Sequence, residues 1–180
     1  LGRFGVVGIE GGRVAFDNVR KVVFLLVSTG AAEVVLVLGA LAAGLPLPLL
    51  PVQLLWLNLV TNGIQDVALA FEPAEEDVLD RPPRPPTQPV FDRLMVERTL
   101  VGALVIGGIG LFAFRSLLAG GATVEAARNG LLLLMVLFEN VHIGNSRSET
   151  RSAFRLSPLR SPVLVAGAAL AFAVHLLALY

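Results

Sequence analysis

The chain has 180 residues, of which 55% are hydrophobic and 16% charged, and its mean hydropathy is +0.77. An average soluble domain is about 45 to 50% apolar and about 25% charged, so this composition indicates a membrane protein. The 14 basic and 14 acidic residues balance, and this net charge of zero is uninformative about partners; we expect no nucleic-acid partner. Because cysteine is absent, we expect no disulfide framework and no thiolate metal site. Because the chain starts at Leu1 without a methionine or a signal sequence, we expect it to be part of a longer protein.

The segment 1–19 is mixed in composition and ends before a basic pair, Arg20 and Lys21. Basic residues collect beside the cytoplasmic ends of membrane spans, so this pair marks a membrane boundary. From composition alone, we expect residues 1–19 to form a soluble loop followed by the cytosolic foot of a helix. A more specific interpretation depends on the FDNVRK motif at 16–21.

Two predicted spans follow as a hairpin. Residues 22–43 are almost wholly apolar, with Glu33 near the middle, and a span needs about 20 residues. The uncharged loop after them contains three prolines, which forbid a continuous helix. The second span, residues 52–71, therefore returns at once.

The second span carries polar residues along its middle: Asn58, Thr61, Asn62, Gln65 and Asp66. An ionised carboxylate at a helix centre costs roughly 2.5 to 3.5 kcal/mol, so such groups persist mainly where they face partners, water or an ion. Gly63 is a poor helix former, and we expect a local unwinding that frees backbone carbonyls. If the helix stays intact, Asn58, Asn62 and Asp66 share one face.

The rest of the chain predicts a polar loop and three more spans. Residues 72–95 are rich in proline and carboxylates, which indicates an extended aqueous loop. The span 97–118 has four glycines, which suit close helix packing. The span 126–144 holds Glu139, Asn140 and His142, and in the span 163–180 we expect His175 and Tyr180 to be interfacial anchors or packed polar tips.

The predicted fold is an all-α polytopic membrane helix bundle of about five transmembrane helices, formed by residues 20–180. Its basic residues are unevenly distributed, since only Arg115 and Arg128 fall on one side of the membrane. The other twelve place the N-terminus in the cytosol and the C-terminus outside, and an odd number of spans suggests a lost final helix. These twelve are Arg3, Arg13, Arg20, Lys21, Arg81, Arg84, Arg93, Arg98, Arg147, Arg151, Arg155 and Arg160.

Three acidic residues lie deep in the predicted spans: Glu33, Asp66 and Glu139. Hard cations take oxygen ligands from carboxylates, amides, hydroxyls and carbonyls. With Asn58, Thr61 and Asn62, the three carboxylates would form a cation cage if the helices converge. The alternative is that these groups only hydrogen-bond neighbouring helices and lock the bundle.

Four motifs resemble P-type cation-transporting ATPases of the calcium-pump type. QLLWLNLVTNG, at the start of 53–73, resembles the sixth transmembrane helix of that family, whose usual form is close to QLLWxNLxTDG. FDNVRK at 16–21 is similar to the junction of the phosphorylation domain with the fifth helix, and STGAAEVV at 28–35 to that helix's SSNxGEVV. FENVHIGNSRSE at 138–149 resembles the eighth helix and the loop after it. The resemblance extends over essentially the whole chain and equates its spans with the fifth to ninth helices.

The resemblance implies roles for the positions that match. Glu33 falls on an ion-binding glutamate, Asn58 and Thr61 on sixth-helix ligands, and Glu139 on an eighth-helix acidic ligand. Two positions depart from calcium pumps: Gly30 replaces an asparagine ligand, and Asn62 replaces the TDG aspartate. Asp66, one turn further on, would restore the missing charge. Because ligand charge and number set site affinity, these changes leave the transported cation open.

The resemblance also implies what lies elsewhere in such a pump. The DKTGT phosphorylation motif and the nucleotide-binding domain precede this region, so ATP and Mg²⁺ act through other domains and the chain alone should not hydrolyse ATP. We expect no catalytic residue here. The expected partners are the lipid bilayer, the cytosolic ATPase domains and the first four helices, and the expected location is the plasma membrane.

Two other functions stay open from the residues alone. A secondary transporter or channel subunit would use the same carboxylates as a proton or sodium relay. A degenerate remnant would transport nothing.

Overall fold

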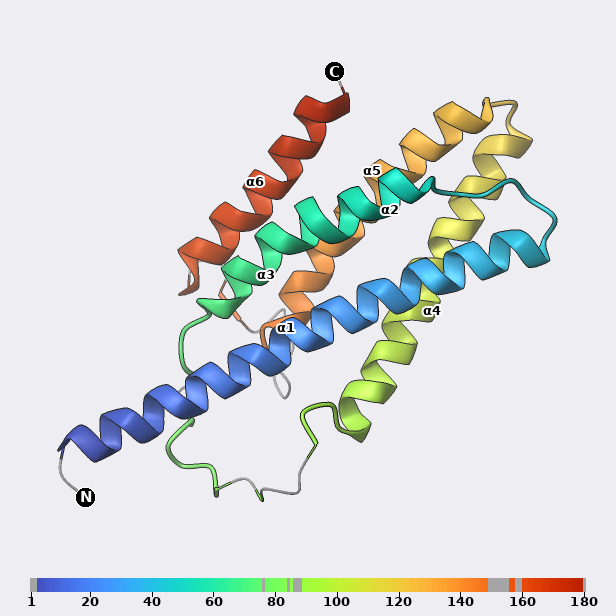
Figure 1. Ribbon diagram of the computed structural model, residues 1–180. Coiled ribbons are helices and arrows are strands. Elements are labelled where there is room, and N and C mark those ends of the chain that lie inside the picture. Colours follow the sequence, from blue (N-terminus) through green and yellow to red (C-terminus); the bar gives the residue numbers. More distant parts are fainter. Residues whose placement is uncertain are drawn as a thin grey trace.

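The structure of the chain, a computed structural model, describes residues 3–75, 77–83, 85, 89–148, 156–157 and 160–179. Within these ranges every regular element is a helix (Figure 1). Arg84, Arg151, Arg155 and Tyr180 lie outside the described residues, as does the side chain of Arg3. In chain order the elements are α1 (Arg3–Ala42), α2 (Pro51–Trp56), the π-helix η1 (Leu57–Thr61), α3 (Asn62–Ala70), α4 (Arg93–Ala119), α5 (Val124–Ser146) and α6 (Pro162–Leu179).

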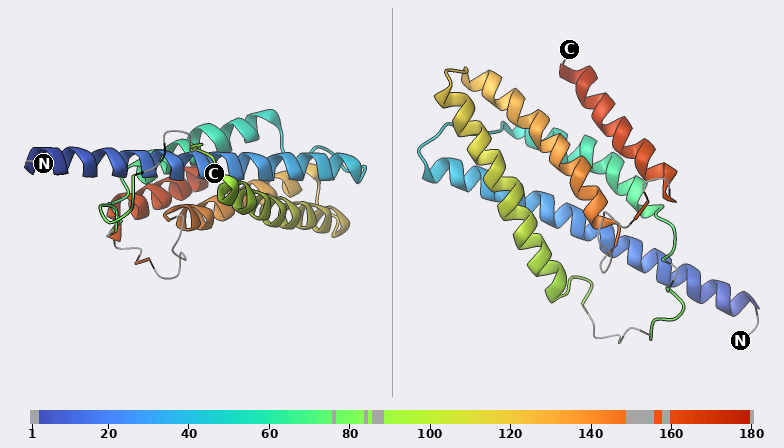
Figure 2. Two further views of the ribbon diagram at one scale, coloured as in Figure 1. Left: turned by 90° about the horizontal axis from the view of Figure 1, so that it is seen from below. Right: turned by 180° about the vertical axis from the view of Figure 1, so that it is seen from behind.

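The helices form the predicted all-α membrane bundle. α1, α4 and α5 are long and apolar enough to cross a bilayer, and α6 is a shorter apolar helix. Pro51–Ala70 is helical throughout, as α2, η1 and α3 in succession. Each of the five predicted spans therefore coincides with a helical stretch. The α1–α2 link and the α4–α5 turn lie at one end of the bundle, and the loop from α3 to α4 lies at the other (Figures 1 and 2).

α1 is the longest element, with 40 residues, and its N-terminal half extends beyond the other helices (Figure 1). The interpretation of residues 1–19 as a loop is wrong for the described part, because the helix is continuous from Arg3. This half contains no proline, and the loop after α3 holds it in place. The Arg13 guanidinium donates to the carbonyls of Val78 and Arg81, at 2.7 Å each.

Glycine allows α4 to approach α1 closely, as the packing interpretation of the third span predicted. A Cβ atom added at Gly107 would lie 2.7 Å from the carbonyl oxygen of Ala32 and 2.8 Å from the Val35 side chain. At Gly110 it would meet Leu36 and Leu131 at 3.5 Å. Gly107 therefore permits the close approach of α4 to α1, since any larger residue there would overlap α1.

The irregular segment of the second span is a π-helix, so the predicted unwinding at Gly63 is wrong. Gly63 lies inside α3, and the helix widens one turn earlier, where the Asn62 backbone N–H donates to the Leu57 carbonyl. In hydrocarbon an unbonded backbone group costs several kcal/mol. A π-turn changes the direction of side chains while its backbone stays bonded, and such turns are frequent at functional sites.

Polar side chains connect the loop after α3 to α1 and α5, and we call this set the loop network. Its strongest links are buried: the Arg147 guanidinium lies 2.8 Å from a Glu72 carboxylate oxygen with both side chains 4% exposed, and Arg20, fully buried, donates to Asp92 at 2.6 Å. Asn18 donates to the carbonyls at the end of α3. The members are Arg13, Asp17, Asn18, Arg20, Lys21, Glu72, Glu75, Asp77, Arg81, Asp92 and Arg147.

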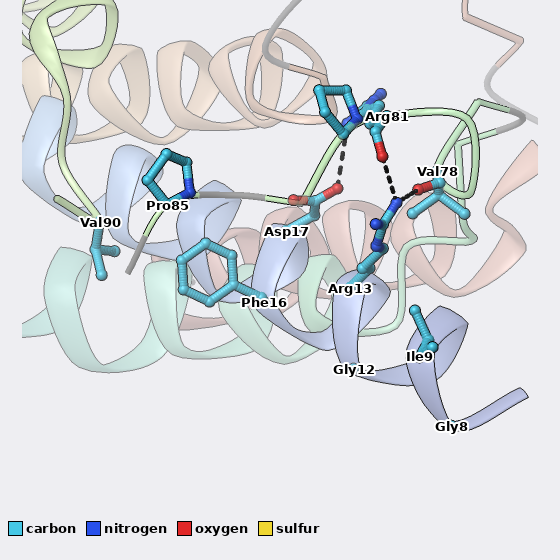
Figure 3. Close-up of a pocket in the computed structure, with 11 residues that line it drawn as sticks. Gly8, Ile9, Gly12, Arg13, Phe16, Asp17, Val78, Arg81, Pro85 and Val90 are labelled. Atoms are coloured by element: carbon cyan, nitrogen blue, oxygen red, sulfur yellow. Dashed lines mark hydrogen bonds and ion pairs between the residues drawn. The ribbon is translucent and has the colours of Figure 1, made fainter. Parts of the chain in front are cut away.

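A cavity of about 530 Å³ lies between α1 and this loop. Figure 3 shows Phe16 and Val90 on its apolar side, and Arg13 and Asp17 reaching toward the loop. Arg81 crosses from the loop to Asp17 at 3.2 Å and also pairs with Asp77 at 2.8 Å. The hydrogen bond to Asp77 raises the pKa of Arg81 above its usual value, so its positive charge persists at any working pH.

Two apolar clusters occupy opposite halves of the bundle, and polar residues lie between them along the helices. The larger cluster includes Leu36 of α1, Leu57 of η1 and Leu131 of α5. The smaller one includes Leu25 of α1, Leu69 of α3 and Ile143 of α5. The intervening positions, which we call the polar layer, are Thr29, Glu33, Asn58, Thr61, Asn62, Gln65, Asp66, Glu139 and Asn140.

Candidate cation site

One side of the polar layer joins the second span to α1 through two hydrogen-bonded pairs. The Asn58 amide donates to both carboxylate oxygens of Glu33, at 3.0 and 2.9 Å. One turn along, the Asn62 amide donates to the Thr29 hydroxyl at 3.3 Å. Asn58 and Asn62 therefore both bond to α1, across the π-turn that separates them. Glu33, 8% exposed, lies against an amide partner.

The other side of the layer joins α3 to α5. The Gln65 amide nitrogen donates to Asn140 Oδ1 at 3.2 Å, and the Asn140 amide donates to the Val136 carbonyl at 2.9 Å. Thr61 lies one turn before Gln65, and both residues are fully buried. The second span is therefore polar on two faces, one toward α1 and one toward α5.

Buried oxygen atoms without a hydrogen-bond partner among the described residues concentrate in this layer. Glu139 is 1% exposed, and neither of its carboxylate oxygens has such a partner. Most buried polar groups in proteins are hydrogen-bonded, so a group of exceptions requires an explanation. The atoms are Thr61 Oγ1, Asn62 Oδ1, Gln65 Oε1, Asp66 Oδ1, and Glu139 Oε1 and Oε2.

The three carboxylates of the predicted cage share this region without forming a compact cluster. Both Glu33 and Asp66 interact electrostatically with Glu139. Within the described residues, however, no three acidic, histidine or cysteine side chains are grouped closely enough to hold a metal ion by themselves. A cation bound here would need amide and hydroxyl oxygens as well. Hard cations accept such neutral oxygen ligands beside carboxylates.

The six predicted site residues all belong to the polar layer, where they are in three different states. Glu33 and Asn58 bond to each other, which is what a purely structural role would require. Asn62 is half-satisfied, because its amide nitrogen is bonded and its oxygen is not. For Thr61, Asp66 and Glu139, a role limited to locking helices together leaves the unpartnered oxygens unexplained.

Sequence reasoning did not include Thr29, Gln65 and Asn140 among the site residues. Thr29 lies four residues before Glu33, so helical spacing places the two on one face of α1. Gln65 follows Thr61 by the same spacing. The four-residue spacing could therefore have identified Thr29 and Gln65 from the sequence, although it does not specify which helix each face contacts.

The two histidines differ in their surroundings. His142 Nε2 lies 2.6 Å from the Ser28 hydroxyl, and its ring packs beside Phe24 with centroids 5.5 Å apart. His175, 1% exposed, is a packed side chain of α6 and not an interfacial anchor. Neither belongs to the polar layer as defined.

Comparison with known proteins identifies the family. The sequence profile described as "Cation transporting ATPase, C-terminus" matches residues 46–180. The chain is 36% identical over 159 residues to "Probable cation-transporting ATPase F" of Mycobacterium tuberculosis, which covers 88% of this chain and 18% of that protein. It is 31% identical over 173 residues to "Calcium-transporting ATPase" of Bacillus subtilis, covering 96% of this chain and 19% of the relative.

These matches favour the pump over the secondary transporter or channel subunit. The chain spans about a fifth of the length of the curated relatives that it matches. Because the profile extends from the α1–α2 link to the end of α6, the chain belongs to the family of P-type cation-transporting ATPases and represents part of their C-terminal membrane region.

Proposed function

We propose that this chain is the cation-binding membrane part of an ATP-driven pump, with a metal cation as its substrate. The six unpartnered oxygen atoms of the polar layer carry the proposal. A buried polar atom without a partner costs about 1 to 3 kcal/mol. A hard cation would provide a partner for several of these oxygens at once.

In this proposal the site residues are Glu33, Asn58, Thr61, Asn62, Asp66 and Glu139. Their carboxylates supply charge, and their amide and hydroxyl oxygens complete the ligand set. Asn62 replaces the aspartate that calcium pumps have at this position, and Asp66 supplies a charge one turn later. The proposal therefore names a metal cation and leaves its identity to measurement.

The long α1 helix is the element through which ATP hydrolysis would act on the site. In the complete pump, ATP with Mg²⁺ would phosphorylate a cytosolic aspartate outside this chain, and the resulting motion would displace the N-terminal half of α1. Glu33 and Thr29 lie on the same continuous helix. Movement of α1 would therefore change the bonds that Asn58 and Asn62 make.

The same proposal assigns orientation and partners. The N-terminal half of α1 and the loop network would lie in the cytosol, where segment 1–19 would join the phosphorylation domain. The first four helices of the pump and the lipid bilayer would surround the bundle, in the plasma membrane. Basic residues of the loop network, among them Arg13, Arg20 and Arg81, gather at this end as the positive-inside rule requires.

The double variant Glu33→Gln, Asp66→Asn of the complete pump tests the site. It removes two charges with little change of shape, and we expect ATP-dependent cation uptake into membrane vesicles to fall at least tenfold. Glu125→Gln, an exposed change in the first turn of α5, is the control and should transport normally. Unchanged cation binding and uptake in the double variant would refute the proposed site.

A further inference from the structure

Gln65 is a fully buried polar residue whose two amide atoms are in different states. Its nitrogen donates to Asn140 Oδ1 at 3.2 Å, while its oxygen, Oε1, has no partner among the described residues. Burying an amide oxygen without a hydrogen bond is unfavourable, because the oxygen loses its bonds to water. If Gln65 served only to hydrogen-bond α3 to α5, its buried oxygen without a partner would have no explanation.

The surroundings of Gln65 point to a ligand. Asp66 and Glu139 follow and precede the bonded pair in sequence, and these two carboxyl groups interact electrostatically. Thr61, one turn before Gln65 and also fully buried, has an unpartnered hydroxyl oxygen. Residues next to the Gln65–Asn140 pair in sequence, or one helical turn from it, therefore carry oxygen atoms without partners among the described residues.

Another glutamine on the second span shows what a purely structural amide looks like. Gln53 Nε2 lies 3.4 Å from Asn129 Oδ1, also on α5, and Gln53 Oε1 accepts from the Leu50 backbone N–H at 2.9 Å. Both ends of the Gln53 amide are therefore bonded, at an exposed helix start. Gln65 has the same type of asparagine partner, but its oxygen has no partner in the part of the chain that the structure describes.

We propose that Gln65 is a further cation-binding residue, which contributes Oε1, and that Asn140 is a positioning residue that holds its amide. The inference rests on the proposed function, because it extends the same site toward α5. A neutral oxygen adds a ligand without adding charge. The number of ligands increases, while the carboxylates alone determine the charge of the site. The number and the charge of the ligands together determine the affinity for hard divalent cations.

The experiment measures equilibrium binding of Ca²⁺ and of Mn²⁺ to the purified complete pump, together with ATP-dependent uptake of each ion. Gln65→Met and Asn140→Leu keep side-chain size and remove the amides. Partners that orient metal ligands typically contribute 10- to 100-fold in affinity, so we expect each variant to raise the half-saturating concentration of at least one ion about 10- to 100-fold. The maximal rate should change much less.

The double variant separates positioning from general stabilisation. If Asn140 acts through Gln65, adding Asn140→Leu to Gln65→Met should weaken binding no further, because coupled residues are not additive. Gln53→Met and Asn129→Leu are matched controls and should bind both ions with unchanged affinity. Thermal unfolding of each variant checks that the protein is folded.

Three outcomes would overturn the inference: unchanged affinity for both ions in Gln65→Met, additive losses in the double variant, or no binding of either ion by the unaltered pump. Loss of affinity in Gln65→Met without any ATP-dependent uptake by the unaltered pump would support the inference and refute the proposed function. ATP-dependent uptake with normal affinity in Gln65→Met would support the proposed function and refute the inference about Gln65.

Discussion

The molecule has two polar regions that are built in opposite ways. In the loop network, charges meet opposite charges, as in the buried pair Glu72–Arg147 and in the contacts of Arg81 with Asp17 and Asp77. In the polar layer, the carboxyl group of Glu139 has no partner among the described residues and instead interacts with two other carboxyl groups. In the loop network the charges are paired with opposite charges, although Glu72 Oε2 has no hydrogen-bond partner among the described residues; in the polar layer the carboxyl group of Glu139 has no opposite charge among them.

This difference between the loop network and the polar layer suits the two regions to different roles. A paired network resists separation, so the loop is well suited to fix α1 against α3 and α5. An unpaired layer is destabilising by itself and, in the proposed function, would gain stability when a cation supplies partners. Mutations in the loop network should therefore mainly lower stability, and mutations in the polar layer should mainly impair transport.

Breaking the Glu72–Arg147 pair should have the largest effect on stability. Arg147→Ala leaves a buried carboxylate without its charge partner, which costs about 3 to 5 kcal/mol in comparable buried pairs. We expect a large fall in the thermal unfolding midpoint in detergent micelles. Arg93→Ala is the control, because its pair with Glu97 has side chains 92% and 56% exposed and such pairs contribute about 0 to 1 kcal/mol. Equal effects of the two changes would mean that the loop network does not hold the bundle together.

Gly107→Ala should have the next largest effect, through packing alone. The added methyl group would overlap the Ala32 carbonyl and the Val35 side chain, and overpacking typically costs about 1 to 3 kcal/mol. Gly108→Ala is its neighbour and control, since a Cβ atom there meets nothing within 4 Å and alanine favours helix by about 1 kcal/mol. The two unfolding midpoints should move in opposite directions. A fall of similar size in both would contradict close α1–α4 packing as the reason for Gly107.

The helices could be predicted from sequence because the bilayer leaves few choices. A long apolar run must satisfy its backbone internally, so the run 97–118 specifies a helix wherever its neighbours lie. The length of α1 could not be predicted in this way, because its N-terminal half is held by distant groups such as the carbonyls of Val78 and Arg81. The π-turn before Asn62 was not predicted, because the low helix propensity of glycine indicated an irregularity at Gly63, whereas the irregular segment is Leu57–Thr61.

The candidate site was predictable as a set of residues and not as an arrangement. Acidic residues are so unfavourable in hydrocarbon that Glu33, Asp66 and Glu139 could be identified singly. Which of them has a partner depends on helix rotation and contact, which periodicity alone does not specify. The Glu33–Asn58 and Gln65–Asn140 hydrogen bonds therefore emerged only from the structure.

Glu139→Gln should have the smallest effect on stability and still impair transport. The substitution keeps the shape of the side chain, and no hydrogen bond to a described residue is lost, so we expect an unfolding midpoint that is unchanged or higher. Uptake of the transported cation by the complete pump should fall at least tenfold, because the site loses a charged ligand. Glu125→Gln makes the same chemical change in the exposed first turn of the same helix and should leave uptake intact. If Glu139→Gln instead lowered the midpoint as much as Arg147→Ala, Glu139 would belong with the structural pairs of the loop network, and the contrast between the two polar regions would fail.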